Sequence, residues 1–185
     1  MSNIFFTSDT HAYHKNILKF CPTTRHGDNA EEMVELLVQA HNSTVGPDDE
    51  VWNLGDVSFG NDKQTLAFLR RLNGKHRLIL GNHDQVIKKN PEIWLFFESV
   101  STEAEFKIGK QGFYLHHFAH RVWNKAHHGV IHLYGHSHGG LEGTPWGKSM
   151  DVGIDARPLG DMKPWHLDEI LEIMKDRPIL GHHDG

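Results

Sequence analysis

The stretch VIHLYGHSHGG, residues 130–140, joins an apolar run to a glycine and two histidines placed one residue apart. The apolar run predicts a buried β-strand, and the glycines predict a sharp turn directly after it. His136 and His138 therefore either lie in a surface loop or point toward one position at the strand end. The rest of the sequence distinguishes these two interpretations.

Four other apolar runs are also followed at once by Asp, Asn or His. They are IFFTS before Asp9 and His11, VWNL before Asp56, RLIL before Asn82, His83 and Asp84, and FYL before His116 and His117. Because ligand sites of open α/β sheets form at the carboxyl ends of strands, we expect these side chains to converge. We expect the glycines at these turns (Gly55, Gly81 and Gly135) to provide backbone of positive φ.

The order of elements predicts the fold class. Amphipathic helices are expected over residues 28–43, 62–74 and 165–175, and strands over 3–8, 49–54, 76–80, 103–108, 111–117, 129–135 and 148–155. Helices in the first half and strands in the second favour an α/β fold of two packed sheets with helices outside. We expect one domain over residues 1–178 and a loose tail over 179–185, with His182 and His183 solvated.

Composition narrows the class of protein. No apolar run approaches the ~20 residues of a membrane span, and residues 1–11 are too short and polar for a secretory signal. Cys21 is the single cysteine, which excludes an internal disulfide and a cysteine-based zinc site. We therefore expect a cytoplasmic protein without a membrane partner. The formal charge of −5 argues against a stable nucleic-acid partner, and the oligomeric state is left open.

The residue types at the strand ends indicate the metal. Carboxylate, carboxamide and imidazole groups without thiolate suit Mn²⁺, Fe or Zn²⁺. The candidate ligands are too many for one tetrahedral ion and fit two ions. They are Asp9, His11, Asp56, Asn82, His117, His136 and His138. One aspartate can bridge two ions about 3.5–4 Å apart, the spacing of two-metal phosphoryl-transfer sites.

These blocks together resemble a known family. D-x-H at 9–11, G-D at 55–56, G-N-H-D at 81–84, a later histidine and G-H-x-H at 135–138 are similar to the signature of the calcineurin-like metallophosphoesterases. The resemblance covers residues 5 to about 155 and fits a small bacterial or phage-type member. It implies a four-layer α/β/β/α sandwich of two mixed sheets flanked by helices, with a dinuclear metal site at the strand carboxyl ends.

The resemblance also implies a role for each residue. Asp9, His11 and His138 would hold one ion, Asn82, His117 and His136 the other, and Asp56 would bridge them. His83 would face the substrate and pair with the acid Asp84, both as catalytic residues. Within YLHHFAH, residues 114–120, the sequence offers three histidines for the fifth block. Strand alternation favours His117 over His116 as the ligand.

We therefore expect a hydrolase that cleaves phosphate esters with a metal-bridging hydroxide and two divalent ions. Manganese is the expected metal, with iron, zinc or nickel as alternatives. A small domain without a large cap suits phosphodiesters, and small nucleotide-like substrates in particular. A phosphomonoesterase or protein phosphatase is the alternative. A non-catalytic scaffold on the same fold is a further alternative, but it predicts damaged ligand positions.

Some residues near these blocks have less specific interpretations. His14, Asn82 and His83 are candidates for contacting the substrate, although packing is at least as common a role for His14. Arg25 and Arg121 could bind phosphate, but we expect solvated arginines. Trp123 and Trp146 could stack on a base, but packing is the more common use of tryptophan. We expect Asp151 and Asp155 to belong to a strand and its turn.

Overall fold

The computed structural model describes residues 2–143, 146–158 and 160–181. The strands are β1 (Ile4–Thr7), β2 (Glu50–Asn53), β3 (Lys75–Ile79), β4 (Phe97–Ser101), β5 (Glu103–Ile108), β6 (Gln111–His116), β7 (Ile131–Tyr134), β8 (Ser149–Asp151) and β9 (Trp165–His166). The helices are α1 (Ile17–Phe20), α2 (Ala30–Asn42), α3 (Asp62–Leu69), α4 (Gln85–Lys89), α5 (Pro91–Trp94) and α6 (Leu167–Lys175). His182 and His183 of the predicted tail lie outside the described residues.

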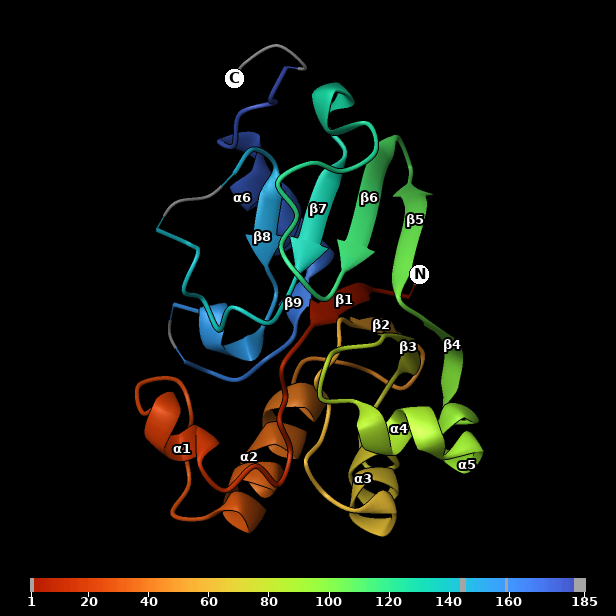
Figure 1. The fold of residues 1–185 in the computed structure, drawn as a ribbon, viewed down its shortest axis with the longest axis vertical. Helices are drawn as coiled ribbons and strands as arrows, with labels where there is room; N and C mark the ends of the chain where they lie inside the picture. The colour runs from red at the N-terminus through yellow and green to blue at the C-terminus, as the bar shows by residue number, and fades with distance from the viewer. Residues whose placement is uncertain (1, 144–145, 159, 182–185) are drawn as a thin grey trace.

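The first sheet has five strands in the order β4-β3-β2-β1-β9 (Figure 1). Strands β1 to β4 are parallel, because a helical segment leads from each of them to the next. Strand β9 pairs antiparallel with β1 and closes the sheet at its other edge. Strand β4 was not predicted, since its apolar residues do not alternate clearly. Residues 165 and 166, predicted as the start of the last helix, form the two-residue strand β9 instead.

The second sheet has four strands in the order β5-β6-β7-β8. Strands β5 and β6 form an antiparallel hairpin, whereas β6, β7 and β8 are parallel. In Figure 1 the arrowheads of β6 and β7 point toward the first sheet. The prediction of an α/β fold with two mixed sheets flanked by helices is confirmed.

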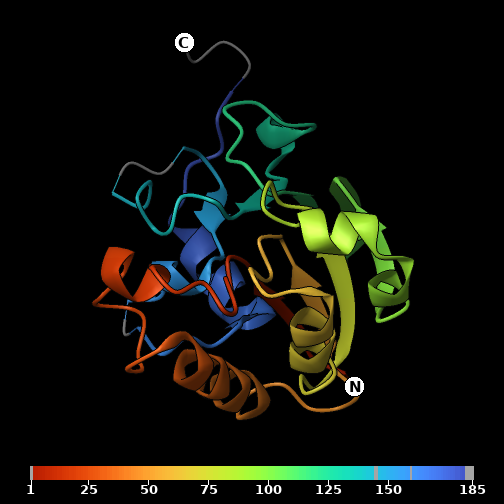
Figure 2. The ribbon, with the colours of Figure 1, turned by 60° about the horizontal axis from the view of Figure 1, so that its bottom comes forward.

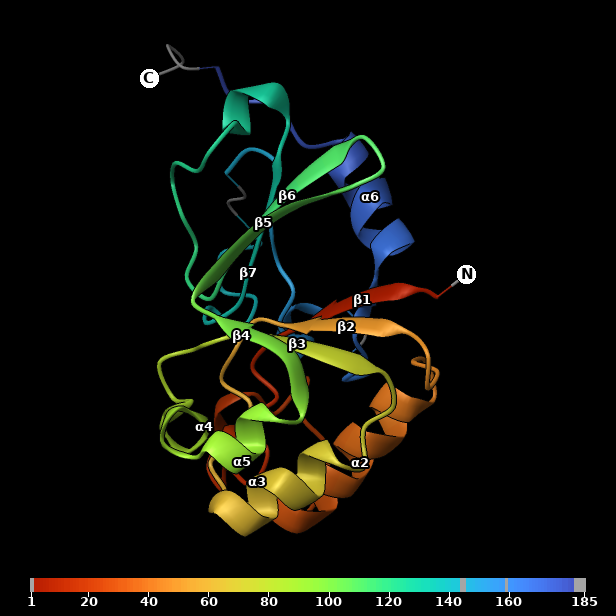
Figure 3. The same ribbon diagram turned by 90° about the vertical axis from the view of Figure 1, so that its right-hand side faces the viewer.

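Two apolar clusters hold these layers together. Helices α2 and α3 lie on one side of the first sheet (Figures 2 and 3) and pack Met33, Leu37 and Phe68 against it. The second cluster fills the space between the sheets and includes Phe6 and Leu133. Ile170 and Met174 of α6 belong to the same cluster. Among the described residues, the helices are too short or too polar to cross a bilayer.

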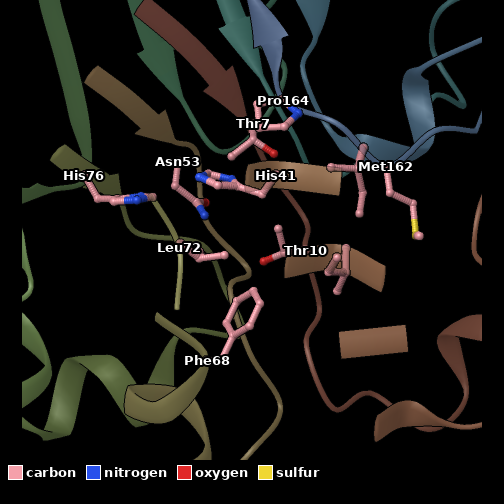
Figure 4. A pocket seen from close by; sticks show the side chains of 11 residues that line it. Thr7, Thr10, His41, Asn53, Phe68, Leu72, His76, Met162 and Pro164 are labelled. Atoms are coloured by element: carbon pink, nitrogen blue, oxygen red, sulfur yellow. The ribbon is translucent and has the colours of Figure 1, made fainter. Parts of the chain in front are cut away.

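A small cavity lies between the first sheet and helices α2 and α3, close to Thr7 and Asn53 (Figure 4). His41 and His76 also line it, and its volume is about 10 Å³. A cavity of this size holds about one water molecule. It is too small for a substrate, so a site for chemistry must lie elsewhere on the fold.

Two buried histidines belong to the folded framework. Burial lowers the pKa of His76 and of His132 to about 3. The His132 Nδ1 lies 3.2 Å from the Tyr114 carbonyl oxygen and donates to it. Its Nε2 accepts a hydrogen bond from the His120 backbone N–H at 3.0 Å. A proton on Nε2 would remove this acceptor, so the fold requires neutral His132.

This requirement predicts a loss of stability in acid. The unfolded chain takes up a proton at each histidine near pH 6.5, whereas the folded chain does so only near pH 3. The stabilisation from the neutral histidines is complete above pH 6.5. As the pH falls from 6.5 toward 3, each histidine lowers the free energy of unfolding by about 1.4 kcal/mol per pH unit. We expect His132→Gln to be less stable at about pH 8 but to lose stability less steeply toward about pH 5 in urea denaturation. The exposed-site control His128→Gln should keep the wild-type slope, and an unchanged slope in His132→Gln would refute the neutral buried state.

Candidate metal centre

The predicted ligands meet where five strands end. β1, β2 and β3 of the first sheet and β6 and β7 of the second lead into loops at a common edge. Donor atoms of Asp9, His11 and His138 lie within 4.8 Å of one another, and so do those of a second group. This second group consists of Asp56, His117 and His136. The structure therefore brings together six of the seven predicted ligands in two groups.

The seventh predicted ligand, Asn82, lies beside the second group. The Asn82 Oδ1 lies 2.9 Å from the His117 Nε2. His117 is buried, while His116 points to the other side of β6 and lies 3.4 Å from the Phe118 carbonyl oxygen through its Nδ1. Strand alternation thus places His117, and not His116, in the site.

Asp56 lies between the two groups. Its Oδ2 is 3.5 Å from the His11 Nε2 and 3.4 Å from the His117 Nε2. Its Oδ1 accepts a hydrogen bond from the His83 backbone N–H at 2.8 Å. One carboxylate therefore faces a histidine of each group, which is the position that a bridging ligand requires.

Protonation chemistry at the centre follows from this crowding. Burial would raise the pKa of Asp56, but the imidazoles of His11 and His117 beside its carboxylate hold this pKa far below the usual range. Burial would lower the pKa of His11, but the carboxylates of Asp56 and Asp9 raise it. The same balance raises the pKa of His117. Asp56 is therefore an anion at neutral pH, in an environment that attracts positive charge.

Buried atoms without partners test whether this donor set fits metal ions. Within the described residues, Asp9 Oδ1 and both ring nitrogens of His11 are buried and make no hydrogen bond. Leaving such groups unpaired costs about 1–3 kcal/mol each. A cation at the first group would satisfy the Asp9 Oδ1 and one ring nitrogen of His11. The oxygen and imidazole donors of both groups suit Mn²⁺, Fe or Zn²⁺. The residues present fit two divalent ions.

The backbone at these donors is strained. Left-handed φ angles occur at Asp9 (56°), His11 (47°), Asp56 (55°), His136 (66°) and His138 (48°). Non-glycine residues in this region cost about 1–3 kcal/mol each and persist where the surroundings enforce them. Such strain gathered at one set of side chains marks the loops as shaped for a site.

Two of the three glycines at these turns, Gly81 and Gly135, serve a different purpose from the one predicted. Only Gly55 has a positive φ, 101°, whereas Gly81 and Gly135 do not. A Cβ on Gly135 would lie 2.4 Å from the Asp9 Oδ2, and one on Gly81 would lie 2.2 Å from the Asp56 Oδ1. These two glycines are therefore needed because the loops approach closely, while the ligands themselves adopt the left-handed conformation.

Two histidines of the site are oriented from behind. The His117 Nδ1 lies 2.7 Å from the Leu54 carbonyl oxygen, which fixes the proton on Nδ1. The His138 Nδ1 lies 2.7 Å from the Asp155 Oδ2. In both rings Nε2 is left with its lone pair toward the donor group. Such partners hold metal-ligating histidines in the required tautomer.

Asp155 is itself held by a buried arginine. The Arg25 Nε and Nη2 donate to its two carboxylate oxygens at 2.8 and 2.6 Å. Arg25 also donates to the backbone carbonyls of Asp9 and Thr10. It is only 3 % exposed, so the expectation of a solvated arginine was wrong. No local sequence pattern indicates this pair, because the two residues are 130 positions apart.

Asp84 is positioned differently from the prediction. Its Oδ1 accepts from the Val57 N–H at 2.8 Å, and its Oδ2 accepts from Asp56 and Gly81 N–H groups at 2.9 and 2.7 Å. The carboxylate is fully buried and its oxygens are occupied, so the predicted pairing with His83 is wrong. Asp84 is a positioning residue that ties the loops after β2 and β3 together.

Asp151 has a similar role in the loop of residues 135–140, which follows β7. Its Oδ2 accepts from the Ser137 hydroxyl at 2.6 Å and from the Gly139 N–H at 2.9 Å. Burial and the charge of Asp9 raise its pKa to about 6. Asp151 ends strand β8, as expected, but its side chain fixes the turn that carries His136 and His138.

The substrate candidates lie at the rim. His83 and Asn82 are exposed, and the His83 ring centroid is 6.1 Å from that of His11. The His14 ring lies 5.7 Å from His11, and burial lowers its pKa. Burial also raises the pKa of the Cys21 thiol to about 11, which makes this thiol a poor nucleophile at neutral pH.

The tryptophans and Arg121 lie further out. Trp123 is buried and its Nε1 donates to the Val130 carbonyl, so its role is packing, as expected. Trp146 is 40 % exposed, and the Arg121 guanidinium lies over its ring at 4.7 Å. Sequence reasoning did not single out Phe59 or Phe118, which pack on the histidines of the centre.

This chain is similar to known proteins in sequence and in fold. Fold and donors define a two-sheet α/β protein with two adjoining candidate metal-binding groups. The chain is 34% identical to the gene 66 protein of Mycobacterium phage L5 over 185 residues, covering 84% of this chain and 88% of that protein. The chain belongs to the family of this phage protein. No protein-family model matches the sequence.

The chain is also similar to solved structures. The crystal structure of AQ665 from Aquifex aeolicus, a protein of unknown function, has a TM-score of 0.70 with 19% identity, covering 94% of this chain and 100% of that one. It shares the fold. A novel archaeal phosphodiesterase has a TM-score of 0.43 and 20% identity over 72% of each chain.

The buried Arg25–Asp155 pair predicts a large stability effect. Arg25→Met leaves the Asp155 carboxylate buried without its main partner, which typically costs about 3–5 kcal/mol. Urea denaturation of the metal-free protein measures this change. The matched control is Arg71→Met, which breaks the exposed pair with Glu35 and should destabilise the protein far less, since solvent screens that pair. Equal losses in the two variants would contradict a structural role for the buried pair.

Proposed function

We propose that this protein is a metal-dependent phosphoesterase that hydrolyses phosphodiesters of small, nucleotide-like compounds. The observation that carries the proposal is the position of the Asp56 Oδ2, 3.5 and 3.4 Å from histidine nitrogens of two separate donor groups. The resemblance of the five motif blocks to the calcineurin-like metallophosphoesterases supports the same conclusion. So does the presence of every expected donor, which a non-catalytic scaffold would not need.

The bound metals and the protein would divide the work. Two divalent cations at these groups supply positive charge for the phosphoryl oxygens and lower the pKa of an attacking water. Asp9, His11 and His138 would hold one ion, and His117, His136 and Asn82 the other, with Asp56 shared. Manganese is the proposed metal.

The protein's own contribution at the reacting end is His83. Its side chain is exposed beside the centre, while its backbone N–H is fixed by the Asp56 Oδ1 at 2.8 Å. This anchoring places the imidazole next to the donors without making it one of them. His83 then donates a proton to the oxygen of the leaving group, or a hydrogen bond to the transition state.

A substrate panel tests the activity. The protein is stripped with a chelator, supplied with Mn²⁺ and given bis-aryl and mono-aryl phosphates, cyclic nucleotides, dinucleotides and single-stranded DNA. We expect metal-dependent hydrolysis, with diesters cleaved well above monoesters and with Asp56→Asn inactive. Faster cleavage of monoesters would overturn the diester preference, and failure on the whole panel would favour a scaffold.

His83→Ala separates catalysis from metal binding. Because His83 contacts the substrate and is not a metal donor, the variant should retain both ions, measured by elemental analysis. Its kcat should fall about 100-fold or more, as is usual when a general acid is removed. His128→Ala, an exposed histidine remote from the strand ends, serves as the control. An unchanged kcat in His83→Ala would exclude the proposed proton donation.

A further inference from the structure

Each of the two donor groups has a half-exposed phenylalanine beside it. Phe59 and Phe118 are both 41 % exposed. Scattered apolar residues on a surface need no explanation. Here, however, the two rings pack on histidines of the centre, one on each side, so their positions relative to the site require one.

Phe59 lies beside the first group. Its ring centroid is 5.1 Å from that of His11, 4.9 Å from His83 and 4.2 Å from His14. Its backbone N–H donates to the Ala12 carbonyl at 2.8 Å, which ties it to the loop after β1. Phe20, which is 69 % exposed, continues this side with its ring 6.2 Å from His14. The result is a row of rings that leads away from His11 through Phe59 and His14 to Phe20.

Phe118 lies beside the second group and directly follows the ligand His117. Its ring centroid is 4.6 Å from that of His136 and 5.0 Å from that of His117. Its backbone N–H donates to the His116 Nδ1 at 3.0 Å. The ring is thus held at the opposite end of the donor pair from Phe59, since it packs on the other pair of histidines.

Other exposed aromatic residues are engaged already. The Arg121 guanidinium covers the Trp146 ring, whose Nε1 donates to the Arg121 carbonyl at 2.7 Å. The Trp94 Nε1 donates to the Ile87 carbonyl at 2.7 Å, beside α5. Phe59 and Phe118 therefore offer the ring surfaces that adjoin both donor groups.

We propose that Phe59 and Phe118 are specificity-determining residues that stack on planar groups on the two sides of the scissile phosphate. The favoured substrate is then a phosphodiester with an aromatic ring, such as a nucleobase, at each end. Stacking of a base on an aromatic side chain tolerates every base, so the sequence of the substrate matters little. A cyclic mononucleotide has one base and can use only one of the two rings.

The neighbouring histidine assigns a direction. His83 acts on the leaving oxygen in the proposed function, on which this inference rests, and its ring is 4.9 Å from that of Phe59. The leaving group therefore carries the ring that stacks on Phe59, and the retained group carries the ring that stacks on Phe118.

Three diesters and two conservative variants test this arrangement. The first substrate is a dinucleoside monophosphate. The other two are a nucleoside 3′-(ethyl phosphate) and a nucleoside 5′-(ethyl phosphate), each with a single base. Phe59→Leu and Phe118→Leu keep apolar volume but remove the ring. We expect each variant to raise KM for the dinucleoside substrate about 10-fold with little change in kcat. On each ethyl diester only one variant should raise KM, and the two variants should exchange roles between the two esters.

Controls separate this inference from a structural role and from the proposed function. Leu95→Ala, which removes an apolar side chain that is 87 % exposed, should leave every KM unchanged. Both phenylalanine variants should retain wild-type metal content. Unchanged KM values, equal effects of both variants on both ethyl esters, or a KM increase from Trp146→Leu instead would overturn the inference while the wild-type activity stands. Absence of diester hydrolysis by the wild type would instead overturn the proposed function.

Discussion

Buried aspartates that accept backbone N–H groups from neighbouring loops hold the centre together. Asp151 binds the loop after β7, and the Asp9 Oδ2 accepts from the His136 N–H at 2.8 Å, joining that loop to β1. Asp56 and Asp84 continue the series by joining the loops after β2 and β3. Each carboxylate thus connects two strand ends, and together they link the second sheet to the first. This series joins the loops that carry Asp9, Asp56 and His136.

The same arrangement of donors lowers the stability of the folded chain. Five donors have left-handed backbone angles, and acidic groups are buried close to one another. Apolar packing between the sheets and beneath α2 and α3 provides the opposing stabilisation. Residues at functional sites commonly hold such strain, because the surrounding structure determines their conformation. The two apolar clusters therefore stabilise the fold that carries the loops.

The sequence revealed the parts of the site that lie in short, local patterns. An apolar run followed by Asp, Asn or His is visible without alignment, and it located the donors on both sheets. It did not reveal partners distant along the chain, such as Arg25 with Asp155. Asp84 was misassigned because adjacency to His83 in sequence does not decide where a carboxylate points. Phe59 was missed because an isolated phenylalanine usually belongs to a core.

The hydrogen bond between the His136 N–H and the Asp9 Oδ2 joins residues that are 127 positions apart. Contacts of such long sequence separation form late, since the intervening chain must first be ordered. A nascent chain emerging from the ribosome carries Asp9 and His11 long before it carries the loop after β7. Neither donor group is therefore complete before the loop after β7 has been synthesised. The complete centre can therefore assemble only after the strands of both sheets up to β7 have been synthesised.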